Sequence, residues 1–384
     1  MRFVFTPAVD SPYDKRLIAG LAGEIAKAGH DVRLLSLNEY TRENLGNADI
    51  CFDVNHARPG WLPTNVRHIA WVQDFIPSVY LHYGERKKPG DVVYVLTNPD
   101  AQGVDAKYVD GALLTGVHPD LLVTPPVERT IDISLCGYIP PPLDNLIFNE
   151  VEQWPGPVSF GKFCHNEIEK FYVPLCGDLR CIENYTKLHN LYLKKMDGLF
   201  TSQAIVSMWQ RAMVHTGHWV MDHPRRLDRS ILARMALSVT DNCLFMGHNW
   251  KMYGEFADKS KPHTDNEQDL LKTYNKSRIN LHTNSDGYGP HSRVLESMAV
   301  GGFIMTHTVK YPEKGGCMRD HFTPEVHFGE FTPENFEERA KFWLENIPAR
   351  EWATLECRGL IESRHLWRHR VAQLLKDLGL SNNA

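Results

Sequence analysis

Short apolar segments alternate with helical patterns from the start of the chain, and this alternation limits the folds available to it. Residues 2–6 lie in a strand-like run, residues 17–30 have helical spacing, and residues 31–37 read as a second strand. A strand, a helix and a second strand in this order place the two strands parallel in one sheet. The opening of the chain therefore predicts an α/β domain built on a parallel sheet.

The same alternation divides the chain in two. Strand-like runs continue to about residue 125, a stretch with three prolines follows at 118–130, and the alternation returns near residue 242. We expect two Rossmann-like, doubly wound domains that face each other across a cleft. The expected parts are a first domain at 1–125, a second at 126–376, a helical insertion at about 143–237 and a closing C-terminal helix at 355–378.

Composition excludes several classes of protein. The 384 residues are 42% hydrophobic and 23% charged, as in a soluble globular protein. The net charge of −5 argues against a broad nucleic-acid surface. The chain has no long apolar run, its N-terminus does not read as a signal peptide, and its eight cysteines include no CxxC pair. We therefore expect a cytoplasmic protein without a metal site, with at most peripheral membrane contact.

Residues 285–306 (SDGYGPHSRVLESMAVGGFIMT) concentrate polar groups between a predicted strand and a predicted helix. Glycines in such a loop allow close approach of a ligand, and the free amides of a helix N-terminus attract phosphate oxygens. An arginine there adds a charge-assisted contact, and a glutamate one turn later accepts hydrogen bonds from a ribose diol. The predicted nucleotide-binding residues here are Gly287, Gly289, His291, Ser292, Arg293 and Glu296. The alternative is an ordinary loop followed by an Arg293–Glu296 surface pair.

A family resemblance covers residues 130–376. The stretch 274–306 resembles the C-terminal domain of GT-B glycosyltransferases, in particular the CgeB-like (spore maturation protein CgeB) family, with the shared pattern at Arg293, Glu296, Ala299, Gly301 and Gly302. Residues 130–142, 225–250 and 356–375 are similar to further segments of that family. The first domain resembles it only in the order of its elements.

The resemblance implies transfer of a sugar from a nucleotide-sugar donor to a hydroxyl of a glycan, a lipid-linked glycan or a protein. It also implies a role in the synthesis of cell-surface polysaccharide or glycoconjugate. No metal cofactor is implied, because helix amides and basic side chains stabilise the leaving diphosphate. Further groups implied for the donor site are Gly137, Lys251 and His282, with Arg225 or Arg226 as alternative sources of positive charge.

The acceptor hydroxyl needs either a base or assistance from the donor phosphate. His56 and Asp74 follow predicted strands of the first domain and are candidate bases, whereas Asp10 reads as a helix-capping acid. Asp286 lies upstream of Glu296, and the separation of these two acids is larger than that of the paired glutamates in many retaining GT-B enzymes. The analogy with those paired glutamates slightly favours retention of the anomeric configuration.

Three other functions stay open at this point. A nucleotide-sugar epimerase would use the same fold and act without an acceptor, and a non-catalytic module would bind nucleotide without turnover. An NAD-dependent oxidoreductase is disfavoured, because the loop after the first strand lacks the glycine pattern of dinucleotide-binding folds.

Overall fold

The computed structural model describes residues 1–74, 82–142, 166, 172–176, 179–182, 194, 222, 225–264, 266–283, 289–309 and 315–380. Most of the expected helical insertion at 143–237 lies outside these residues, as do Asp286 and Gly287 of the predicted site. Within the insertion the described parts include an antiparallel strand pair, β8 (Tyr172–Cys176) and β9 (Leu179–Ile182), and helical residues at 225–239, which extend just past its expected end.

The first domain is a parallel six-stranded sheet with the strand order β2-β1-β3-β4-β5-β6. Helix α1 (Pro12–Lys27) follows β1, and it starts where the Ser11 side chain accepts from the Asp14 amide and Pro12 occupies the first turn. Its apolar side, including Leu17 and Leu21, is buried in the domain core. The strands are β1 (Arg2–Thr6), β2 (Asp31–Leu34), β3 (Ile50–Val54), β4 (Arg67–Val72), β5 (Val92–Val95) and β6 (Gly111–Ala112), and shorter helices are α2 (Arg42–Leu45), α4 (His82–Arg86) and α5 (Pro99–Gln102).

The second domain repeats this architecture with the strand order β11-β10-β7-β12-β13-β14, again parallel throughout. Its strands are β7 (Ile131–Cys136), β10 (Cys243–Met246), β11 (Ser260–Lys261), β12 (Ser277–His282), β13 (Ile304–His307) and β14 (Gly329–Phe331). Its helices include α9 (Glu267–Lys276), α10 (Ser292–Ala299) and α11 (Phe336–Glu345). Both sheets are therefore parallel α/β layers, as the alternating sequence predicts.

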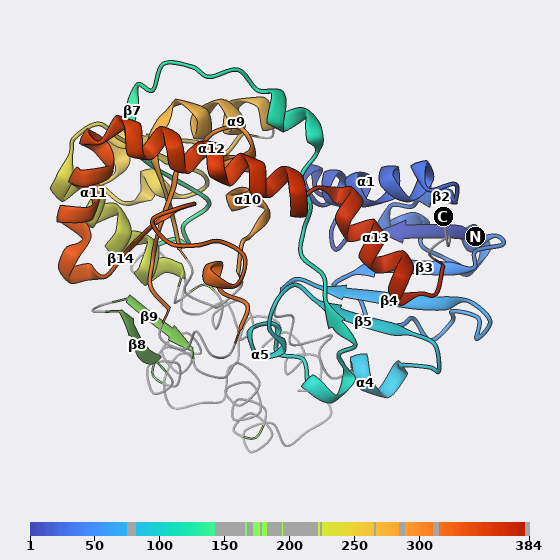
Figure 1. Cartoon of the computed structure of the whole chain (residues 1–384). Helices are drawn as coiled ribbons and strands as arrows, with labels where there is room; N and C mark the ends of the chain where they lie inside the picture. Colours follow the sequence, from blue (N-terminus) through green and yellow to red (C-terminus); the bar gives the residue numbers. More distant parts are fainter. Residues whose placement is uncertain are drawn as a thin grey trace.

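The C-terminal segment joins the two domains. The expected closing helix at 355–378 is divided into α12 (Ile347–Arg364) and α13 (Trp367–Asp377), and Figure 1 shows them running from the second domain back to the first. Trp367, Val371 and Leu374 of α13 are buried in the core of the first domain, against α1. Each buried side chain of this size contributes about 2 kcal/mol, so the crossing is a stable connection. Residues 367–376 thus lie with the first domain, although the sequence assigns them to the second.

Among the described residues, no helix combines the length and the apolar character needed to cross a membrane.

Candidate functional site

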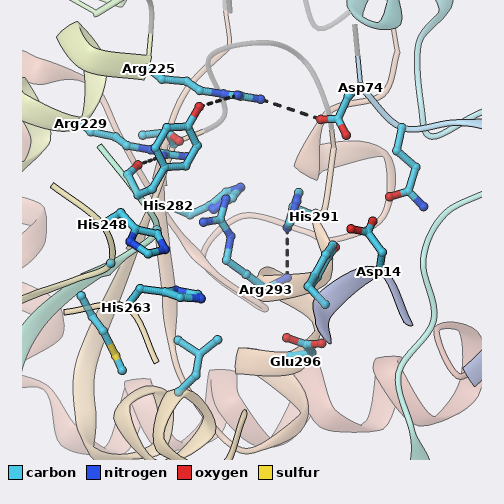
Figure 2. Close-up of a pocket in the computed structure, with 18 of the residues that line it drawn as sticks. Asp14, Asp74, Arg225, Arg229, His248, His263, His282, His291, Arg293 and Glu296 are labelled. Atoms are coloured by element: carbon cyan, nitrogen blue, oxygen red, sulfur yellow. Dashed lines mark hydrogen bonds and ion pairs between the residues drawn. The ribbon is translucent and has the colours of Figure 1, made fainter. Parts of the chain in front are cut away.

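A cavity of about 430 Å³ lies between the two domains. Parallel strands of an open sheet present their carboxyl ends to ligands, and segments that follow β4, β7, β10 and β12 all reach this cavity. The first domain contributes Tyr13, Asp14, Arg16, Gln73, Asp74 and Leu96, and the second contributes Gly137, Tyr138, Arg225, Arg229, Met246, Gly247, His248, His263, Thr264, Leu270, His282, Thr283, His291, Arg293 and Glu296. Figure 2 shows Asp14 and Asp74 on one side of the cavity, and Arg225, Arg229, His248 and His263 on the other.

The N-terminus of α10 opens into this cavity. His291 is the N-cap, and its Nδ1 accepts a hydrogen bond from the Arg293 amide at 3.3 Å. Burial, and next the nearby Arg293 charge, hold the pKa of His291 well below its usual range, so the ring stays neutral and can accept. Gly289 has a φ of 61°, and a Cβ there would lie 2.8 Å from the Gly316 carbonyl oxygen. The structure brings the predicted residues Gly289, His291 and Arg293 together at this turn, and phosphate binding there stays a prediction.

Arg293 lies over the end of β7. Its Nη1 donates to the Cys136 carbonyl at 3.2 Å, and its Nε is buried with no partner in the described structure. Gly137 follows Cys136 with a φ of 146°, and a Cβ there would overlap Arg293 Nη1. The absence of a side chain at Gly137 therefore makes room for the guanidinium, which explains why this predicted glycine belongs to the site.

We expect Gly137→Ala to displace the Arg293 guanidinium and to impose a backbone conformation that alanine rarely adopts. The strain should destabilise the fold by about 1–3 kcal/mol in urea unfolding, and nucleotide affinity should fall with it. Gly254→Ala is the matched control, because a Cβ at Gly254 meets no atom within 4 Å. Equal unfolding free energies and equal affinities for the two variants would contradict this role of Gly137.

Glu296 lies one turn beyond Arg293, with only 8% of the residue exposed. Its Oε1 accepts from Arg16 Nη2 of the first domain at 3.0 Å, while its Oε2 is buried and without a partner in the described structure. Burial raises the pKa of Glu296 to about 7, against the lowering effect of Arg16. The alternative of an exposed Arg293–Glu296 pair is therefore wrong, because Glu296 is buried and pairs with Arg16.

A basic wall extends from α10 along the second domain. Arg229 lies 5.2 Å from the centre of the Tyr138 ring, and Arg225 Nη1 donates to the Tyr138 hydroxyl at 2.9 Å. Arg225 also approaches Asp74 of the first domain, at 4.0 Å between Nη2 and Oδ1. Arg225 was one of the sequence candidates, whereas Arg229 and Tyr138 were missed. Their sequence signal is the four-residue spacing of Arg225 and Arg229 on one helix and the position of Tyr138 next to Gly137.

Three histidines complete this wall. The rings of His248, after β10, and His263, after β11, stack with their centres 4.3 Å apart. His282 ends β12, as predicted, and lines the cavity. Burial, and next the nearby Arg293 and Arg229 charges, keep the pKa of His282 well below its usual range. The neutral His282 ring can therefore donate or accept a hydrogen bond without a cost in charge repulsion.

The first domain supplies the acidic wall. Asn55 adopts a left-handed conformation after β3, and its side chain accepts from the amides of Gln73 and Asp74 and donates to Asp74 Oδ2 at 3.1 Å. This clamp fixes Asp74, a sequence candidate, at the cavity. Asp14 also lines the cavity, and burial, with Asp74 as a further cause, raises its pKa. Sequence reasoning considered Asp10 and missed Asp14, whose signal is its place three residues after the Ser11 cap.

Several predicted residues do not reach the cavity. Lys251 is exposed in the short 3₁₀ turn Trp250–Met252, because its neighbour Trp250 is buried and fixes that turn. His56 follows the turn at Asn55 and has a buried Nδ1 away from the cavity lining. The Nε of Arg226 donates to the Pro141 carbonyl at 2.7 Å, and Arg226 does not line the cavity.

Two further residues that the sequence analysis considered make contacts outside the cavity. Ser292 contacts the Tyr13 hydroxyl at 2.7 Å and so helps to join the domains. Asp10 pairs with Lys15 at 3.4 Å.

Comparison with known proteins agrees with this architecture. Residues 225–376 match a family model described as glycosyl transferase-like. No curated protein sequence matches the chain. A glycosyltransferase from Rickettsia africae ESF-5 superposes with a TM-score of 0.50 at 11% identity, over 100% of this chain and 99% of that one. An alpha-glucosyltransferase in complex with UDP and a 13-mer DNA gives a TM-score of 0.52 at 10% identity, over 99% and 100% of the two chains.

The chain therefore has the GT-B fold: two Rossmann-like domains, each with six parallel strands, on either side of a cleft. This confirms the fold class predicted from the sequence. Within that class, the sequence of the second domain is glycosyl transferase-like from residue 225 onward. The narrower CgeB-like assignment stays a prediction.

Proposed function

We propose that the protein is a glycosyltransferase that moves a sugar from a nucleotide-sugar donor to a hydroxyl acceptor. The observation that carries the proposal is the arrangement on α10, where Arg293 and the helix amides lie one turn from the unpaired oxygen of Glu296 in one cavity. The first group suits a diphosphate and the second a ribose diol. UDP is the first nucleotide to test, because the alpha-glucosyltransferase with the same fold was solved with UDP.

The proposed reaction does not need a metal. As the bond to the donor sugar breaks, the diphosphate leaves with added negative charge. Arg293, Arg225 and Arg229 lie on the same wall of the cavity and can balance that charge, together with the amides at the start of α10. These groups do the work that a divalent cation does in other transferases.

The acceptor hydroxyl enters from the first domain in this proposal, opposite the basic wall. Asp74 is the proposed base, and it lies there beside Asp14. The analogy with Asp286 favours retention of the anomeric configuration, a course that needs no base behind the donor sugar. The carboxylates of Asp74 and Asp14 suit the other course, inversion. The anomeric configuration of the first product, read by NMR, decides between the two courses.

The proposed acceptor is a hydroxyl of a glycan, a lipid-linked glycan or a protein, and the proposed setting is cytoplasmic synthesis of cell-surface polysaccharide or glycoconjugate. Support for this setting comes from the resemblance to the CgeB-like family. Screening such acceptors with the nucleotide sugar that the protein binds tests it, and a nucleic-acid acceptor would overturn it.

A thermal shift assay tests the donor site directly. A nucleoside diphosphate at about 100 times its Kd should stabilise the protein by about 2.7 kcal/mol, and Glu296→Ala should lose most of that shift. Glu345→Ala is a control, because Glu345 is exposed at the end of α11.

The same samples separate the proposal from its alternatives. If no UDP, GDP, ADP, CMP or TDP compound shifts the melting temperature, the donor site is wrong. Conversion of a nucleotide sugar without any acceptor would indicate an epimerase, and binding without turnover would indicate a non-catalytic module.

A further inference from the structure

Arg16, a charged residue of the first domain, contacts Glu296 of the second domain inside the cavity. This residue lies on α1, and its guanidinium reaches across the cleft to α10 and α9. We propose that Arg16 is a positioning residue that holds one oxygen of Glu296, so that the other oxygen is presented to a vicinal diol, and that nucleotide binding therefore requires the docked arrangement of the two domains. The inference rests on the proposed function, since it assumes that Glu296 receives the nucleotide.

The geometry of Glu296 supports this division of its two oxygens. Arg16 Nη2 donates to Oε1 at 3.0 Å, and Arg16 Nη1 lies 3.3 Å from Glu267 Oε1 at the start of α9. The guanidinium is thus fixed by two carboxylates from two helices of the second domain. Oε2 of Glu296 is buried and has no partner among the described residues, which leaves an acceptor that a ligand or water can satisfy.

Neighbouring contacts place Arg16 at a built interface. From the same helix α1, the Tyr13 hydroxyl lies 2.7 Å from Ser292 Oγ at the N-terminus of α10, and the Tyr13 ring stacks on His291. On the opposite side of the cavity Arg225 approaches Asp74. The first domain therefore touches α10 at its N-cap, its first residue and Glu296, and a ligand on α10 is bound between two domains rather than on one.

The charge of Glu296 depends on the same contact. The titratable groups that face its carboxyl are Arg16 and Tyr13 of α1, Glu267 and Tyr274 of α9, and Arg293 of α10. Burial raises the pKa of Glu296 to about 7, and Arg16 is the first of the groups that oppose this rise. Without Arg16 the carboxyl would hold its proton to a higher pH. A protonated carboxyl accepts fewer hydrogen bonds, so a diol would bind less tightly near pH 7.

The test measures the binding of UDP-glucose by calorimetry from about pH 6 to pH 9, a range in which its diphosphate diester does not titrate. For the wild type, affinity should rise with pH through the pKa of Glu296. For Arg16→Gln, affinity at pH 7 should fall roughly tenfold, and the midpoint of the pH dependence should move upward. Arg16→Lys, which keeps the charge, should restore part of the affinity at pH 7 and part of the wild-type midpoint. Lys15→Gln is the matched control, because Lys15 is exposed on the same helix and pairs with Asp10.

The outcomes separate this inference from the proposed function. If the wild type binds neither UDP-glucose nor any other nucleotide of the thermal shift panel, or if Glu296→Ala binds as tightly as the wild type, the donor site itself is wrong. If Glu296→Ala loses binding but Arg16→Gln keeps the wild-type affinity and the wild-type midpoint, only the role of Arg16 is overturned. A folded Arg16→Lys variant with the Arg16→Gln profile would show that the geometry of the guanidinium, and not only its charge, is required.

Discussion

Replacing Arg293 with alanine is expected to lower kcat/KM by roughly 100- to 1,000-fold. Arg293 is the second residue of α10, and its Nε is buried without a partner in the described structure. A charge fixed in this way acts on the leaving diphosphate most strongly when negative charge builds up on it. The loss should therefore appear in kcat as well as in the affinity for nucleotide.

Two further variants make this prediction specific. Arg293→Lys keeps a charge but loses the fork of donors, so its activity should lie between those of the wild type and the alanine variant. Arg234→Ala is the control, because Arg234 is exposed and pairs with Glu255 away from the cavity. An Arg293→Ala variant with wild-type kcat and a raised KM would show instead that Arg293 binds the ground state and the transition state equally.

The fold was predictable because local sequence determines it. The run Arg2–Thr6, the helix that follows and the strand after it carry their own apolar periodicity and turn signals, so a β-α-β unit can be read without knowledge of any distant contact. The right-handed crossover rule then makes the sheet parallel. The same holds for α10, whose proline at 290, N-cap and apolar face lie within ten residues.

The site was predictable only where its residues follow a strand or begin a helix. Gly137 and Asp74 follow strands, His282 ends one, and Arg293 lies in the first turn of a helix, so their positions in the fold bring them to the cleft. Lys251 also follows a strand, but the buried Trp250 fixes the turn and leaves Lys251 exposed. Which side of such a turn faces the cleft depends on packing that a single sequence does not reveal.

Contacts between the domains could not be predicted. Arg16 and Glu296 are separated by 280 positions, and neither has a sequence neighbour that indicates the other. The packing of α13 against α1 has the same cause, since an amphipathic helix shows which face is buried but not against which partner. Arg16 was missed by sequence reasoning for this reason, because α1 reads simply as a capped core helix.

Asp74→Asn is expected to lower kcat by roughly 100- to 10,000-fold, the range that a lost general base produces, with nucleotide affinity near that of the wild type. Asparagine keeps the size of the side chain and an acceptor for Asn55, but it cannot take the proton of the acceptor hydroxyl. In the proposed reaction that proton moves to Asp74 as the new bond to the sugar forms and the bond to the diphosphate breaks. The rate of sugar transfer checks the expected loss in kcat, and the Kd of UDP-glucose, measured on the same samples, checks that nucleotide affinity is unchanged.

Asp14→Asn shows whether one carboxylate or the pair carries the reaction. The Ser11 hydroxyl contacts Oδ2 of Asp14 at the start of α1, so this carboxylate is held at the helix cap and is the weaker candidate for a base. We expect its loss to cost roughly tenfold, and Asp10→Asn, outside the cavity, to cost nothing. A greater loss in Asp14→Asn than in Asp74→Asn would make Asp14 the base. An equal fall in nucleotide affinity and in rate for Asp74→Asn would instead mean that Asp74, through its approach to Arg225, only holds the domains together.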